Sequence, residues 1–209
     1  MSLRDASALG GVPPLPAGPP YPCAELGAWA GLAFDLPDLD GRLRAIHEGG
    51  EEPTPPLANL AGARMAWDRW PEHMDFLAKD SPMYAQKRAE RALYLQRWEP
   101  LVPRGSRILD LGGGIGRFTQ WCLDRGCSVD LVDPDLRSLH AAVRHAAGRP
   151  GRLDVHWATG ETLPDLGPFD VVIAAEVLCY VEDPARVLAN LRRALRPGAP
   201  LLEIGRAHV

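Results

Sequence analysis

The sequence is poor in the residues that build disulfide frameworks and metal sites. Only four of its 209 residues are cysteine, at positions 23, 122, 127 and 179. No two of them form a C-x-x-C pair, and no histidine pattern at the spacing of zinc ligands accompanies them. We therefore expect reduced thiols in a cytoplasmic protein, and no metal site.

Long apolar runs and an excess of positive charge are also missing. No apolar stretch is long enough to cross a bilayer, and the N-terminus lacks the cationic start and apolar run of a secretory signal. The net charge of −4 leaves no electrostatic footprint for a nucleic acid. These absences favour a cytoplasmic chain whose partner is neither a membrane nor a nucleic acid.

Proline is unevenly distributed, and it divides the chain. Ten of the 21 prolines fall before residue 57, and proline interrupts helices. We predict a proline-rich N-terminal extension at 1–57, a helical segment at 58–100 and an α/β core at 101–209. The extension is expected to be extended or partly disordered, except for an apolar stretch at 24–34 that docks on the core.

The most informative segment is 108–119, which reads as a buried strand, a glycine-rich turn and the start of a helix. Its acid and glycines are spaced as Asp110-x-Gly112-x-Gly114-x-Gly116. Glycine permits positive φ and lets a ligand approach the backbone closely. The N–H groups of a helix that begins near Arg117 point into the same turn. This combination predicts a nucleotide-type site at the first crossover of an open α/β sheet.

The spacing then separates two kinds of nucleotide. The dinucleotide fingerprint G-x-G-x-x-G requires a third glycine at the position of Arg117. A carboxylate at Asp110 repels a pyrophosphate, but it pairs with a cationic ligand group directly or through water. On these residues the sequence resembles the class I S-adenosylmethionine (SAM) dependent methyltransferases, whose cofactor carries an ammonium and a sulfonium instead of phosphates.

The resemblance implies a Rossmann-like α/β fold, a doubly wound and mostly parallel sheet flanked by helices. Five strands are expected. The first begins the 108–119 segment, and the other four lie at 128–133, 153–158, 169–175 and 201–204. Helical patterns lie between them at 135–147 and 184–195. A further helix, at 83–98, precedes the first strand and belongs to the N-terminal appendage.

Several cofactor contacts follow from the same resemblance. Asp133 ends the second strand, where an acid binds ribose hydroxyls, and NAD enzymes share that feature. Pro134 follows it. Residues Thr159, Gly160 and Glu161 correspond to the segment that holds the adenine.

The remaining site candidates flank the reacting end of the cofactor. Tyr84 and Arg88, four residues apart on one helix face, match residues that relatives place over SAM, and an ordinary amphipathic surface explains them equally well. Glu176 after the fourth strand is open to three roles: a general base, a contact to the ammonium, or a helix-cap acid. Tyr180 stands where many relatives have histidine, so no metal is inferred. The catalytic residue is unassigned, with Glu176 and Tyr180 as the candidates.

Residues 101–106 read Leu-Val-Pro-Arg-Gly-Ser, which is the string of a thrombin site used in expression tags. We interpret it as natural, because it runs without interruption into the first strand. Thrombin is expected to cut it if the loop is exposed.

The predicted function is transfer of a methyl group from SAM to a small molecule, at an O, N or C atom. The sequence ends at Val209, just past the fifth strand, whereas class I relatives continue with a helix and an antiparallel pair. The edge of that strand would be covered by a second copy or partner, by the N-terminal extension, or by a missing part of a longer protein. The alternative function is therefore a non-catalytic or incomplete SAM-binding unit, and a dehydrogenase ranks third.

Overall fold

The computed structural model describes residues 23–36, 38–39, 41–42, 45, 49–50, 52 and 83–205. The expected boundary between residues 57 and 58 lies outside this part of the chain. In chain order the elements are α1 (Cys23–Phe34), α5 (Tyr84–Trp98), the 3-10 helix η3 (Glu99–Leu101), β1 (Arg107–Leu111), α6 (Arg117–Asp124), β2 (Ser128–Asp133), α7 (Leu136–Ala146), β3 (Arg152–Trp157), β4 (Val171–Ala175), α8 (Pro184–Ala194) and β5 (Leu201–Ile204). None of these helices is both long and apolar enough to cross a membrane.

The five strands form one sheet in the order β3-β2-β1-β4-β5, and every neighbouring pair is parallel. Strand β1 lies at the centre, with Leu109 opposite Asp130 of β2 and Val172 of β4. This confirms the predicted Rossmann-like, doubly wound fold, and the order reverses at β1, where such folds bind ligands. The fourth strand is shorter than expected because Phe169 makes only an isolated bridge, to Leu195.

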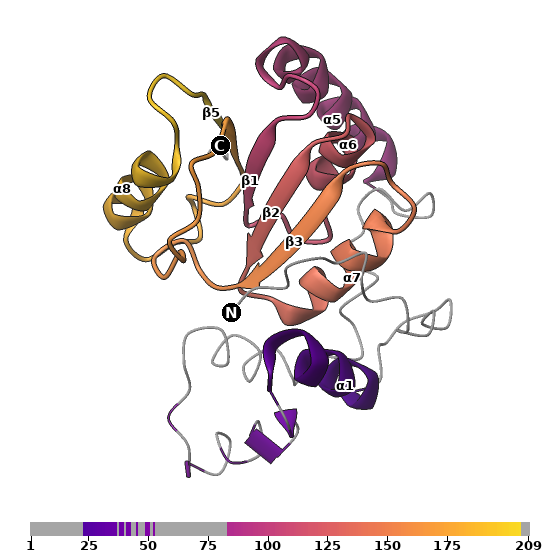
Figure 1. Cartoon of the computed structure of the whole chain (residues 1–209), viewed down its shortest axis with the longest axis vertical. Helices are drawn as coiled ribbons and strands as arrows, with labels where there is room; N and C mark the ends of the chain where they lie inside the picture. The colour runs from indigo at the N-terminus through magenta and orange to yellow at the C-terminus, as the bar shows by residue number, and fades with distance from the viewer. Residues whose placement is uncertain are drawn as a thin grey trace.

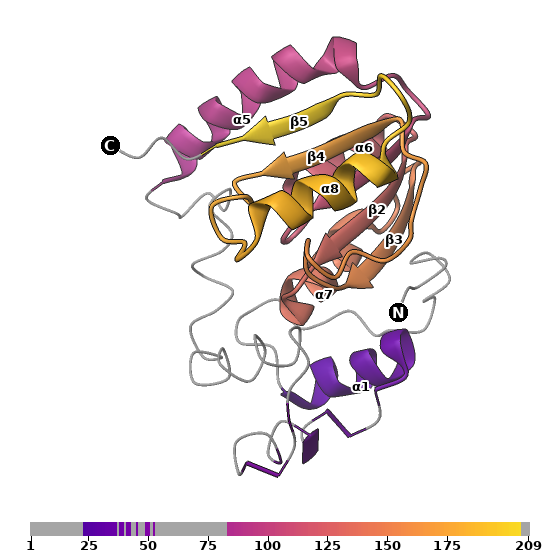
Figure 2. The same cartoon turned by 90° about the vertical axis from the view of Figure 1, so that its left-hand side faces the viewer.

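Helices cover both faces of the sheet (Figures 1 and 2). One face packs on α5, α6 and α7 through residues such as Ile108 and Ile173. The other face packs on α8 through residues such as Leu109 and Val172. A strand that is buried on both faces must be apolar at successive positions, which is why the strands read as continuous apolar runs.

The docked stretch of the N-terminal extension is helix α1, as expected for 24–34. Trp29 and Phe34 of α1 are 2% and 1% exposed, and the Trp29 ring centroid lies 4.8 Å from that of His140 on α7. Burial lowers the pKa of His140 to about 4, with a further contribution from Arg144. The apolar stretch therefore forms a packed helix of 12 residues despite the surrounding prolines.

Helix α1 does not cover the β5 edge. Both cartoons show α1 against α7, on the β3 side of the sheet and away from β5 (Figures 1 and 2). Within 83–205 and the described N-terminal residues, β5 pairs only with β4. The expectation that the N-terminal extension covers this edge is thus wrong for its described part, because the apolar face of α1 is already buried on α7.

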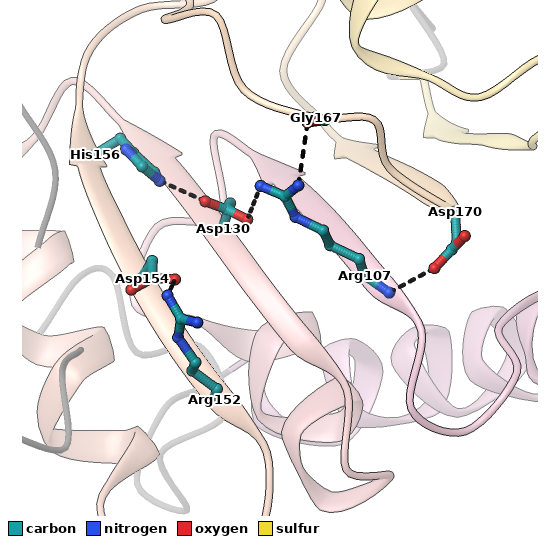
Figure 3. Close-up of polar contacts among 7 residues, drawn as sticks. All are labelled: Arg107, Asp130, Arg152, Asp154, His156, Gly167 and Asp170. Carbon is teal, nitrogen blue, oxygen red and sulfur yellow. Dashed lines mark hydrogen bonds and ion pairs between the residues drawn. The ribbon is translucent and has the colours of Figure 1, made fainter. Parts of the chain in front are cut away.

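A partly buried polar layer ties the first three strands together (Figure 3). The Nε2 atom of His156 lies 2.7 Å from Asp130 Oδ1, and both side chains are almost completely buried. Asp130 Oδ2 is also 3.4 Å from a guanidinium nitrogen of Arg107. The same guanidinium donates to the Gly167 carbonyl at 3.1 Å, and the Arg107 backbone N–H donates to Asp170 at 2.8 Å. The layer therefore joins β1, β2 and β3 to the β3–β4 connection.

We expect Asp130→Ala to lower the free energy of unfolding by about 3 kcal/mol, because it leaves two polar partners without their acceptor. Asp165→Ala removes an exposed carboxylate from the nearby connection, and it is expected to change stability by less than about 0.5 kcal/mol. Urea unfolding of both variants tests this. Equal stability of the two variants would show that the layer adds nothing to folding.

The Leu-Val-Pro-Arg-Gly-Ser string forms a tight turn. Arg104 and Gly105 are exposed at its tip, and Gly105 has φ 76°. The Ser106 hydroxyl donates to the Pro103 carbonyl at 2.8 Å, while Val102 on the other side is fully buried. A protease could therefore bind the string in extended form only after Val102 left the core.

We expect thrombin to cut the native chain after Arg104 about tenfold more slowly than it cuts a peptide with the same ten surrounding residues, because native cleavage requires local unfolding. Time courses followed by mass spectrometry, which identifies the bond that is cut, measure both rates. A native rate equal to that of the peptide would mean that the turn opens readily.

Candidate functional site

The turn after β1 takes a backbone path that favours glycine. Gly112, Gly114 and Gly116 have φ of 62°, 55° and 81°. The Gly112 N–H donates to the Val132 carbonyl at 2.7 Å, and Gly116 is the N-cap residue of α6. The glycine spacing seen in the sequence is thus the spacing of three left-handed residues.

The turn is tightly packed at Gly112 and Gly113 and open at Gly114. A Cβ atom added to Gly112 would lie 2.3 Å from Cγ2 of Val177, and one added to Gly113 would lie 2.8 Å from the Asp110 carboxyl. A Cβ atom on Gly114 would meet no atom within 4 Å. Side chains are therefore excluded at the base of the turn by packing, while the space over Gly114 is available to a ligand.

Two buried acids lie beside the turn. Asp110 on β1 is 1% exposed and accepts a hydrogen bond from the Thr119 hydroxyl at 2.5 Å. Asp133 at the end of β2 is 7% exposed. Its two oxygens accept backbone hydrogen bonds from Gly114 and Asp135, both at 2.8 Å. Because each carboxylate oxygen accepts more than one hydrogen bond, Asp133 keeps acceptor capacity for a ligand.

Burial dominates the electrostatics of both acids. It raises the pKa of Asp110 to about 6, against the opposing effect of the hydrogen bond from Thr119. Burial also raises the pKa of Asp133 to about 7, with further repulsion from Asp135 and Asp110, while the two backbone N–H donors oppose the shift. Because burial disfavours the ionised form of both carboxyls, they suit a ligand that brings hydroxyl donors and positive charge.

The expected adenine segment lies between β3 and β4, and several of its polar groups are engaged within the protein. The Thr159 hydroxyl lies 3.1 Å from that of Thr162, in a local turn. Gly160 is buried, and its carbonyl accepts from Asn190 of α8 at 2.8 Å. The Glu161 carboxylate accepts the Glu182 N–H at 2.9 Å. The segment is thereby fixed against α8 and the residues that precede it.

Glu176 follows β4 and takes a strained backbone conformation. Its φ is 58°, and its N–H donates to the Ile204 carbonyl of β5 at 2.8 Å. Its Oε1 atom lies 3.4 Å from Nζ of Lys87 on α5. The neighbouring residue is Val177, which packs on Gly112, so Glu176 lies beside the glycine turn. Tyr180, the other candidate after β4, is 66% exposed.

Helix α5 presents a cation to this region that the sequence analysis did not single out. Arg88 is exposed and donates to the Tyr84 hydroxyl at 2.8 Å. Lys87 reaches Glu176, and Arg91 donates to the Arg117 carbonyl at 2.8 Å. Helical spacing places 84, 87 and 91 on one face, so periodicity could have identified Lys87. Thr119 was also missed, because no local pattern predicts its bond to Asp110.

Comparison with known proteins links the core to methyltransferases. The family described as a methyltransferase domain matches residues 109–201. The matched segment, a little under half of the chain, is thus similar to the methyltransferase domain of SAM-dependent enzymes. A ubiquinone biosynthesis O-methyltransferase from Idiomarina loihiensis is 35% identical over 99 residues, which are 46% of this chain and 41% of that protein.

Two further similarities agree with this family. An uncharacterized methyltransferase from Mycobacterium sp. (strain JLS) is 38% identical over 99 residues, 46% of this chain and 37% of that protein. The chain spans about two fifths of the length of these curated relatives. A solved SAM-dependent methyltransferase from Leishmania major has a TM-score of 0.50 at 24% identity, over 60% of this chain and 53% of that one. It supports the fold alone.

The methyltransferase cofactor fits the chemistry of the turn. SAM brings ribose hydroxyls, an ammonium and a sulfonium, which match the acceptor capacity of Asp133 and the buried negative group of Asp110. A pyrophosphate matches neither acid. Within the described residues no group of three or more His, Cys, Asp or Glu side chains is arranged to hold a metal ion.

The raised pKa of Asp133 predicts how stability depends on pH. Between pH 4 and pH 7 the folded, ligand-free chain holds a proton on Asp133 that the unfolded chain releases, so ionisation costs stability as the pH rises. The Asp133→Asn variant has no such cost. We expect its free energy of unfolding to gain about 2 kcal/mol relative to that of the wild type between pH 5 and pH 8.

Urea unfolding of both proteins at pH 5, 6.5 and 8 measures this gain. Taking the difference between the two proteins removes the contribution of His140, which both contain. A difference that is constant over this range would show that Asp133 titrates normally in the folded chain.

Proposed function

We propose that this chain binds SAM over the Gly112–Gly116 turn and transfers its methyl group to a small molecule. The observation that carries the proposal is the pairing of an open glycine turn with two buried acids. Asp133 would accept hydrogen bonds from the ribose hydroxyls, and Asp110 would face the ammonium directly or through water. Pro134, Thr159, Gly160 and Glu161 would border the adenine.

When bound, SAM supplies an electrophilic methyl group, so the protein has to supply orientation and exclusion of water. Orientation alone is worth roughly 7–11 kcal/mol of the barrier. The turn holds one side of the reacting centre, and the residues after β4 hold another. A strongly basic side chain is required only for an acceptor that must lose its proton early.

Glu176 and Lys87 are the charged groups best placed to orient the acceptor. Their side chains meet at 3.4 Å at the carboxyl end of β4, where α/β folds bind their substrates. We assign Glu176 a positioning role toward a polar group of the acceptor. Tyr84 and Arg88 would close the same end of the site from α5, and Tyr180 would lie at its rim.

A small-molecule acceptor is supported by two observations. Several relatives carry the name ubiquinone biosynthesis O-methyltransferase, which denotes a small organic acceptor for those proteins. The net charge of −4 offers no general attraction to a nucleic acid. The acceptor atom, whether O, N or C, follows from neither.

A second candidate is a SAM-binding unit that turns over only with a partner. It is favoured by the outer edge of β5, which pairs with no strand among residues 83–205 or the described N-terminal residues. An apolar edge of this kind normally has a neighbour. The two candidates share the cofactor site and differ in whether the chain alone is active.

The cofactor site is tested with two glycine variants. Gly114→Ala and Gly148→Ala each place a Cβ atom at positive φ with no atom within 4 Å, so each is expected to cost about 1–2 kcal/mol of stability. Only Gly114 faces the proposed ligand. We expect Gly114→Ala to weaken S-adenosylhomocysteine binding at least about tenfold, and Gly148→Ala to bind like the wild type. Calorimetric titration measures both.

NADH serves as the control ligand, and binding of NADH in place of S-adenosylhomocysteine would indicate a dehydrogenase. Equal loss of affinity in the two variants would show that the ligand does not bind over the Gly112–Gly116 turn. Release of S-adenosylhomocysteine from SAM with small phenols, amines or carbon acids then separates an active chain from a unit that needs a partner.

A further inference from the structure

Helix α1 belongs to the N-terminal extension, yet it packs on the elements that border the proposed cofactor site. Ala30, Ala33 and the rings of Trp29 and Phe34 are buried, while Leu32 on the opposite side of the helix is 75% exposed. The helix therefore docks through a single apolar face. Trp29 contacts His140 in the body of α7, with ring centroids 4.8 Å apart.

The second ring of α1 reaches the end of β3. The Phe34 centroid lies 5.9 Å from that of Trp157, which is the last residue of β3. The Trp157 indole N–H donates to the Pro134 carbonyl at 2.9 Å. Pro134 directly follows Asp133, so a continuous series of contacts runs from α1 to the turn between β2 and α7.

That turn is held at its α7 end and in its middle by elements that α1 contacts. Asp135 donates its N–H to Asp133 at 2.8 Å, and its own carboxylate accepts the Ser138 N–H at the start of α7 at 3.0 Å. Trp157 holds the middle of the turn through Pro134. Helix α7 and the Trp157 ring thus hold the backbone on the C-terminal side of Asp133, while the Gly114 N–H holds its second carboxylate oxygen.

We propose that docking of α1 positions Asp133 for the cofactor ribose, with Trp157 as the residue that transmits its effect. This inference rests on the proposed binding of SAM. Trp157 is a positioning residue, because it acts through the Pro134 carbonyl and the backbone next to Asp133. By thermodynamic reciprocity, a ligand bound by Asp133 stabilises the docked state of α1 by the same factor.

Three variants of the full chain test the proposal. Trp29→Ala removes the ring that docks α1 on α7. Trp157→Phe keeps an aromatic ring against Phe34 and removes the hydrogen bond to Pro134. Leu32→Ala is the matched control, since it shortens an exposed side chain of the same helix. Calorimetry is expected to show about fivefold or greater weakening of S-adenosylhomocysteine binding for the first two, and a change below about twofold for Leu32→Ala.

Two further readouts separate positioning from general destabilisation. If Trp157 acts through Asp133, its effect on affinity disappears in the Asp133→Asn background, because coupled residues are not additive. Hydrogen exchange of the α1 amides is expected to slow when S-adenosylhomocysteine saturates the wild type, and to slow much less in Trp157→Phe. If Trp157 only contributed to folding, S-adenosylhomocysteine would slow exchange of the α1 amides equally in the wild type and in Trp157→Phe.

The outcomes distinguish this inference from the proposed function. No binding by the folded wild type overturns both. Binding by the wild type with unchanged affinity in Trp157→Phe overturns the inference alone, and this conservative variant serves the test even if Trp29→Ala does not fold. Additive effects in the Asp133→Asn background, or an equal loss in Leu32→Ala, also overturn it.

Discussion

The arrangement of the site depends on the close contact between the glycine turn and the central strands. The turn passes so near Val177 and Asp110 that a Cβ atom at Gly112 or Gly113 would overlap with them. This contact sets the position of α6, which begins directly after the turn at Arg117. It also brings the residue after Glu176 against the first glycine. The ends of β1, β2 and β4 consequently meet at one place, as the order β3-β2-β1-β4-β5 requires.

The two buried acids explain why the site suits one class of ligand. Each is held by hydrogen bonds from within the turn or α6, and each has a pKa raised by burial. In the ligand-free protein each of these carboxyls is either ionised or protonated, and both lie where solvent is excluded, so that ionisation is costly. A ligand with hydroxyls and positive charge relieves this cost, whereas a phosphate would add to it. The difference between a methyltransferase and a dinucleotide enzyme is in this sense electrostatic, because both use the same backbone turn.

The helices outside the α/β core give this chain its individual features. Helix α5 brings Lys87 to the carboxyl end of β4, and α1 packs against α7 and the end of β3. Both helices contact residues next to proposed ligand positions, so the N-terminal part of the chain is linked to the site at two separate points. The polar layer of Figure 3 links β1, β2 and β3 of the sheet to one another.

The sequence by itself determined the strand–turn–helix order, the parallel sheet and the positions of Asp110 and Asp133, because apolar runs and glycine spacing are local signals. It also indicated that 24–34 docks on the core. Only the tertiary structure decided that α1 lies on the β3 side, that Lys87 meets Glu176, and that Thr119 holds Asp110. Each of these depends on which faces of distant elements come together in space. A periodic pattern gives the apolar face of a helix, but the neighbour of that face is set by the packing of the whole chain.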